Sequence, residues 1–90
     1  MDVEAILTIV KQDLIIISNI RDDYLRTLIL ACEQELNKRG VYFSNSTDDT
    51  LLLADYVAFR YRHRTDDALL PQNIQLRIAN KKLQRRLHSD

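Results

Sequence analysis

The spacing of apolar residues predicts a central helix over Leu51–Arg64, in the second half of the chain. At about 100° per residue, Leu52, Tyr56 and Phe59 share one face, and further apolar residues cover most of the remaining circumference. A helix that is apolar nearly all round packs against neighbours on several sides. We therefore expect the other helices of the fold to surround this one.

Two more helices are predicted before the central one. The first follows Asp2, which suits an N-cap, and runs to about Lys11. The second is capped by Asn19 or Asp22 and ends at Gly40, because glycine readily adopts the left-handed conformation found at helix ends. The apolar stripe of this second helix comprises Leu25, Leu28, Ile29, Cys32 and Leu36.

The segment between these two helices, Asp13–Ser18, contains three consecutive isoleucines. Branching at Cβ restricts their side chains and favours an extended, buried segment near residues 14–17. The segment is short enough that a helix is equally open there. Ser18-Asn19 ends it with residues typical of turns.

The last predicted helix begins after Pro71, which suits a first helical turn, and covers Gln72 to about Leu87. It has two apolar faces. One face comprises Leu76, Ala79, Leu83 and Leu87, and Ile74 and Ile78 lie nearly opposite. The rest is basic, with no acid to balance Arg77, Lys81, Lys82, Arg85 and Arg86. We expect such a helix to need a neighbouring molecule.

Length and composition bound the fold. Ninety residues, with one glycine and one proline, indicate a single domain over 1–90 of the all-α class: a small bundle of about four helices around the central one. A core this small often gains stability by oligomerisation. Cys32 is expected to be a core residue. Leu30 points away from the stripe of the second helix and is a candidate subunit contact.

The net charge of zero conceals a division along the chain. Residues 1–59 carry ten acids against five bases, and residues 60–90 carry eight bases against three acids. Opposed halves of this kind indicate either a basic arm for an acidic partner or subunits that complement one another.

No enzymatic motif stands out. The pairs Asp22-Asp23, Asp48-Asp49 and Asp66-Asp67 precede apolar runs, where carboxylates cap helices more often than they bind metal. His63 and His88 lack metal-ligand spacing, and no phosphate loop is present. We expect no catalysis, cofactor or metal. The absence of a basic leader and of a long apolar run favours a cytoplasmic protein without a membrane partner.

Arg60, Arg62 and Arg64 alternate with Tyr61 and His63 at the end of the central helix. Cations interleaved with an aromatic residue occur in nucleic-acid-binding proteins, so a small nucleic-acid-binding regulator that uses the basic C-terminal region is one alternative. The first two arginines could instead pair within the chain, with Asp55 or Glu33 as expected partners. A generic helical adaptor for another protein is a further alternative.

Three stretches in order resemble a known family. They are Asp22-Asp23-Tyr24-Leu25 running into Leu28-Ile29-Leu30-Ala31; Leu52-Leu53-Ala54 running into Asp55-Tyr56-Val57 and Arg60-Tyr61; and Pro71 followed by a basic helix with Arg77, Asn80 and Lys81. In order and spacing this set, from Asp22 to Arg86, is similar to the phage head–tail connector (adaptor) family, small helical proteins often labelled as DNA-packaging proteins.

The resemblance implies a structural role in virion assembly. Such proteins form a homo-oligomeric ring, here expected to be dodecameric, on the portal of a tailed bacteriophage; they extend the channel for packaged DNA without sequence specificity and join the head to the stopper and tail. The chain would act in the virion neck after assembly in the host cytoplasm. Docking to portal or neighbour is expected from Arg77, Lys81, Lys82, Arg85, Arg86, Ile74, Ile78 and Leu30, with Arg60, Arg62 and Arg64 as channel or interface cations.

Overall fold

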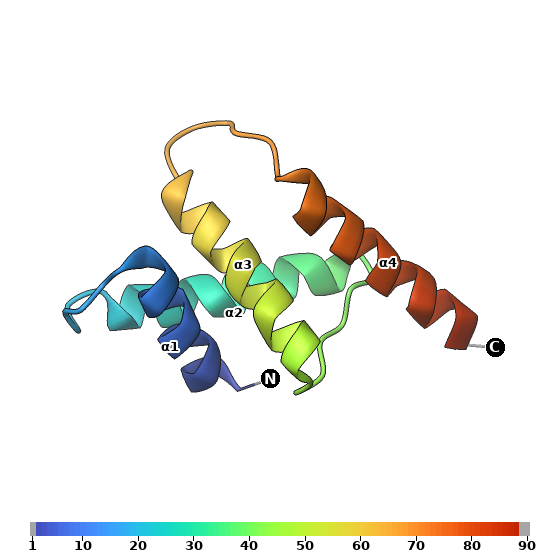
Figure 1. Ribbon diagram of the computed structural model, residues 1–90, viewed down its shortest axis with the longest axis horizontal. Coiled ribbons are helices and arrows are strands. Elements are labelled where there is room, and N and C mark those ends of the chain that lie inside the picture. The colour runs from blue at the N-terminus through green and yellow to red at the C-terminus, as the bar shows by residue number, and fades with distance from the viewer. Residues whose placement is uncertain (1, 89–90) are drawn as a thin grey trace.

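Four helices build the fold in a computed structural model that describes the backbone of residues 2–88 and the side chains of residues 2–84 (Figure 1). They are α1 (Val3–Leu14), α2 (Asp22–Lys38), α3 (Thr47–Arg62) and α4 (Gln72–His88). The described residues contain no strand, so the predicted all-α class and the number of helices are confirmed.

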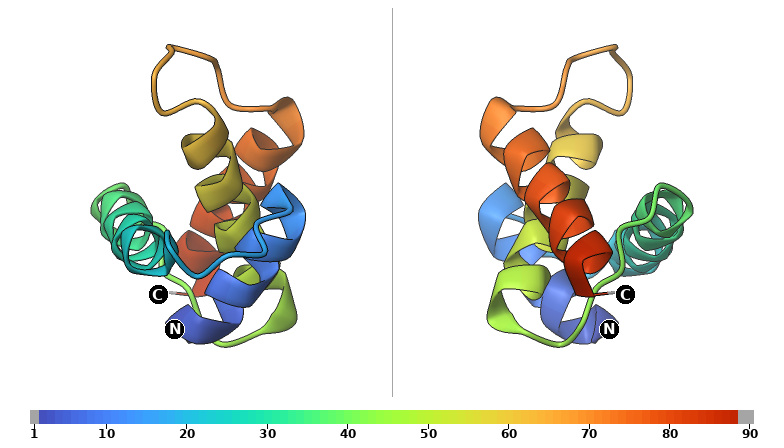
Figure 2. Two further views of the ribbon diagram at one scale, coloured as in Figure 1. Left: turned by 90° about the vertical axis from the view of Figure 1, so that its left-hand side faces the viewer. Right: turned by 90° about the vertical axis from the view of Figure 1, so that its right-hand side faces the viewer.

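Helix α3 lies at the centre and contacts each of the other three helices. Helices α1 and α2 cover one side of it and α4 covers the opposite side (Figures 1 and 2). The largest fully buried side chain is that of Tyr56, and the core also includes Leu53 and Val57 of α3. The apolar circumference predicted from the sequence therefore serves three neighbours at once.

Helix α3 begins four residues before the predicted Leu51. The Ser46 side chain accepts a hydrogen bond from the backbone N–H of Asp49 at 3.2 Å, so the chain becomes helical directly after this N-cap. At the first helix the predicted cap is confirmed: one carboxylate oxygen of Asp2 accepts from the N–H groups of Glu4 and Ala5, both at 3.1 Å.

Helix α1 continues to Leu14 and ends at Ile15, whose backbone is left-handed with φ 57° and ψ 44°. The expectation of an extended, buried isoleucine segment is wrong. After the left-handed turn the chain can direct only part of the segment inward, so Ile16 packs against the core while Ile15 and Ile17 are 83% and 92% exposed. Ile20, farther along the same connection, is 91% exposed.

The start of α2 also differs from its prediction, because neither Asn19 nor Asp22 caps it. The residue before the helix is Arg21, which makes no side-chain capping bond. The two expected caps are held by Lys11 instead: its ammonium donates to the Asn19 side-chain oxygen at 2.9 Å and forms a 2.8 Å ion pair with Asp22. The end of α2 is as predicted, with Gly40 at φ +89°.

Candidate interaction surface

Helix α4 is attached to the fold on one side only. Among the described residues, α3 is the one helix that it contacts. Ile74 and Ile78 form this contact and are buried, with exposed fractions of 5% and 8%. The expectation that these two isoleucines form a free strip for docking is therefore wrong, because α3 has an apolar side left over for them.

Two ion pairs flank this apolar contact. A guanidinium nitrogen of Arg77 lies 2.7 Å from the Asp55 carboxylate, and the Lys81 ammonium lies 2.7 Å from that of Asp49. Both acids belong to α3. Two of the five cations predicted to dock on another molecule are thus engaged within the chain.

Asp49 is a buried carboxylate with several donors. The backbone N–H and the hydroxyl of Ser44 donate to it at 2.6 and 2.9 Å, in addition to Lys81. Burial by itself opposes ionisation of this carboxyl, but the bonds from Lys81 and Ser44 outweigh it and hold the pKa of Asp49 below its usual value. The Lys81 ammonium also lies 5.8 Å from the centre of the Phe43 ring, which ties the α2–α3 connection to α4.

The opposite side of α4 remains uncovered. We call Leu76, Ala79 and Leu83 the leucine strip; the two leucines are each 55% exposed, and Ala79 is exposed as well. Of the remaining predicted docking cations, Lys82 is half-buried and has no ion pair with any carboxylate in the described part of the chain. The side chains of Arg85, Arg86 and Leu87 lie outside the described residues.

The arginines at the end of α3 connect it to the other helices. Arg60 pairs with Glu35 of α2 at 3.3 Å, and Arg62 pairs with Asp13 of α1 at 3.2 Å. The expected partners Asp55 and Glu33 are therefore wrong for both. Arg64 lies over the Tyr61 ring, 4.3 Å from its centre, and donates to the Tyr61 carbonyl at 2.6 Å.

Leu30 is exposed on α2, as its position outside the apolar stripe predicts. The sequence analysis missed the largest exposed apolar group, formed by Ile15, Ile17 and Ile20. A connection between two helices that pack side by side runs over the surface, because buried irregular backbone would leave polar groups without partners. The short interval between the end of the first helix and Ser18-Asn19 was the available signal.

Metal-ligating and nucleophilic groups do not assemble into a site within the described residues. No cluster of three or more His, Cys, Asp or Glu side chains there could hold a metal ion. Cys32 is buried, as predicted, and burial raises the pKa of its thiol to about 12. The aspartate pairs of α2 and α3 lie in the first helical turns, where they meet the positive end of the helix dipole. No helix in residues 2–88 has the length and apolar character needed to cross a membrane.

The comparisons with known proteins add no relative: no family model or curated protein matches the sequence, and no solved structure matches the fold.

Proposed function

We propose that this chain is a head–tail connector of a tailed bacteriophage. In this role it forms a ring, expected to be dodecameric, beneath the portal, extends the channel for packaged DNA and provides the platform for the stopper and tail. The proposal starts from the resemblance of the ordered motifs between Asp22 and Arg86 to that family.

The single observation that carries the proposal is the one-sided attachment of α4. Its inner face holds to α3 through Ile74 and Ile78, while Leu76 and Leu83 remain half exposed on its outer face. An exposed apolar strip on a small monomer marks a surface that another molecule covers. A structural ring protein needs such a surface, whereas an enzyme would need converging polar groups.

The charge distribution supports a protein partner over nucleic acid. Arg60, Arg62, Arg77 and Lys81 each lie within ion-pair distance of a carboxylate of the same chain. Cations neutralised in this way release fewer counterions on binding a phosphate backbone, so they add less to its affinity. The alternative of a regulator that binds nucleic acid through the basic C-terminal region thus loses much of its basis.

Attachment to phage heads tests the proposal. DNA-filled heads that lack neck proteins, from the phage whose portal and capsid genes neighbour this one, are mixed with the protein and sedimented. We expect the wild type to sediment with these heads and not with heads that lack a portal. Equal recovery with both kinds of head, or recovery with neither, would reject the connector function.

The double substitution Leu76→Asp/Leu83→Asp examines the surface itself and is expected to reduce attachment at least tenfold. Both leucines are half exposed, so the fold should survive the change. The matched control is Gln72→Asp/Asn73→Asp, which adds the same charge at exposed positions in the first turn of α4. Deleting α4 would be a poorer test, because it would also remove Ile74 and Ile78 from the core.

A further inference from the structure

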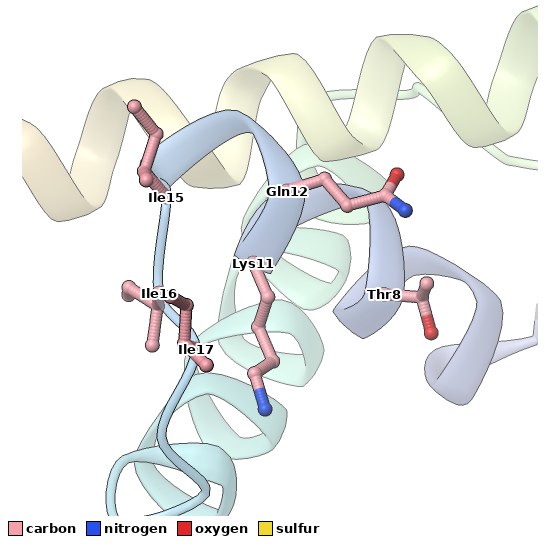
Figure 3. A pocket seen from close by; sticks show the side chains of 6 residues that line it. All are labelled: Thr8, Lys11, Gln12, Ile15, Ile16 and Ile17. Carbon is pink, nitrogen blue, oxygen red and sulfur yellow. The ribbon is translucent and has the colours of Figure 1, made fainter.

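A second apolar feature lies where α1 meets its connection to α2. A groove of about 420 Å³ is lined by Thr8, Lys11, Gln12, Ile15, Ile16 and Ile17, and we call it the isoleucine groove. The three isoleucines form one side, and the residues of α1 form the other (Figure 3). Apolar side chains thus line the groove while polar groups border it, which is the usual composition of a surface that binds an apolar partner.

The backbone at Ile15 indicates that this groove is more than a loosely packed connection. Ile15 is the one non-glycine residue with positive φ among the described residues, and a branched side chain is unfavourable in that conformation. The strain places Ile15 outward at the groove edge, where it is 83% exposed and contributes no core packing. Strained residues of this kind concentrate at binding sites, where the conformation prepares the surface for its partner.

The leucine strip has the form that an apolar groove accepts. Leu76, Ala79 and Leu83 lie at positions i, i+3 and i+7 of α4, the spacing by which a helix lays one face into a groove. Ala79 in the middle allows the helix backbone to approach closely. Each feature alone is an incomplete apolar surface, and together they provide the two halves of a helix-in-groove contact.

One molecule cannot close this contact on itself. The α1–α2 connection and α4 lie toward opposite ends of the longest dimension, which measures 45 Å, with α3 between them (Figure 1). Charge also favours a second copy of the chain as the occupant. The flanks of the groove carry Asp13, Asp22 and Asp23 against Lys11 and Arg21, whereas the sequence of α4 contains five cations and no acid.

We propose that the isoleucine groove of one copy receives the leucine strip of the next. Because the two surfaces differ and lie on opposite sides of α3, the contact is head-to-tail, and its repetition closes a ring or continues as a filament. The inference deepens the proposed connector function and rests on it for the biological setting, since it names the faces that adjacent subunits of the ring would join.

Complementation between two variants tests the head-to-tail arrangement. Ile17→Asp removes the groove and leaves the strip, whereas Leu83→Asp removes the strip and leaves the groove. Sedimentation velocity over a concentration series should show each variant alone associating at least tenfold more weakly than the wild type. An equimolar mixture should form dimers and nothing larger, because one intact groove meets one intact strip. Leu30→Asp, an exposed change on α2 outside both surfaces, should associate like the wild type.

Disulfide trapping provides a second measurement that also detects weak contacts. Under mild oxidation at high protein concentration, Ile17→Cys/Ala79→Cys should give a ladder of covalent oligomers, whereas each single variant should give dimers at most. The native Cys32 is buried and does not compete. The inference is overturned if the double variant gives no ladder, or if Ile17→Asp and Leu83→Asp associate like the wild type.

Failure of this inference is distinguishable from failure of the connector function. If filled heads bind the wild type but Ile17→Asp assembles and attaches normally, the connector function stands and the groove contact is rejected. If the complementation pattern appears but portal-bearing heads bind no protein, the groove contact stands and the connector function is rejected.

Discussion

Ile15 shows at the scale of a single residue how this chain departs from the conformations that favour stability. Its φ of 57° places Cβ against the following carbonyl, which costs a residue with a side chain roughly 1–2 kcal/mol. Helices that end in this conformation usually place glycine there. Because Ile15 is exposed, the fold recovers little of this energy through packing.

Replacing this residue by glycine should therefore stabilise the folded chain. For Ile15→Gly we expect the free energy of unfolding to rise by about 0.5–1 kcal/mol, since the relief of strain exceeds the added flexibility of the unfolded chain. Urea denaturation followed by circular dichroism measures the change. Ile17→Gly, at an exposed neighbouring position without positive φ, is the control and should bring no gain. A less stable Ile15→Gly variant would contradict the strain argument.

Asp49 determines a pH dependence. Its pKa lies below the usual carboxyl value, so the folded state holds the ionised form more firmly than the unfolded state does. This stabilisation is complete above the unfolded pKa, about 3.9 for aspartate. It disappears as the pH falls through the lower, folded pKa. Acid should thus weaken the attachment of α4 to α3 at the Lys81 contact.

The variant Asp49→Asn should lower the free energy of unfolding by about 1–3 kcal/mol at pH 7, because the Lys81 ammonium loses its charged partner. The difference from the wild type should shrink below about pH 4. Urea denaturation at several pH values measures both effects. Asp48→Asn changes the exposed neighbouring acid and should have a much smaller effect. A constant difference across this pH range would show that ionisation of Asp49 is not the cause.

At the scale of helices, the two faces of α4 should differ sharply in their effect on stability. Ile78→Ala creates a cavity against α3 and should lower the free energy of unfolding by about 2–4 kcal/mol. Leu83→Ala changes a half-exposed side chain and should alter it by less than about 0.5 kcal/mol. Equal effects of the two substitutions would mean that α4 is packed differently from the arrangement described.

Helix positions were predictable because local signals mark them: Asp2 and Gly40 act at helix ends through their own chemistry, and the apolar periodicity of α2 and α3 is strong. The choice between the two apolar faces of α4 was not predictable. Both faces are apolar in the sequence, and the side of α3 that remains free decides which one is buried. The exposed isoleucines were missed for a related reason, because apolar character alone does not tell whether a short connection faces inward.

At the scale of the whole molecule, the opposite charges of the two halves are only partly available to partners. Ion pairs join Arg77 and Lys81 of the basic part to Asp55 and Asp49 of the acidic part. The charge division that the sequence predicts for contacts between molecules thus also operates within one molecule. Complementarity between subunits depends on the charges that remain unpaired.

Binding of the isolated chain to DNA should accordingly be weak. We expect a dissociation constant above about 10⁻⁵ M for a duplex oligonucleotide at physiological salt, because four of the cations in residues 60–84 have carboxylate partners. Fluorescence anisotropy over a salt series measures this. The double variant Asp49→Asn/Asp55→Asn frees two cations and should bind more tightly and with a steeper salt dependence. Submicromolar binding by the wild type would favour the nucleic-acid-binding regulator.

Lys11 is the one described residue that holds α1, the isoleucine connection and α2 together, through its contacts to Asn19 and Asp22. Its ammonium therefore fixes the shape of the corner on which the groove is built. In the evolution of this protein the three positions should change in concert: a relative that loses the lysine has no reason to retain the acid at position 22, and an isolated loss should be found mainly where the corner has acquired a different length.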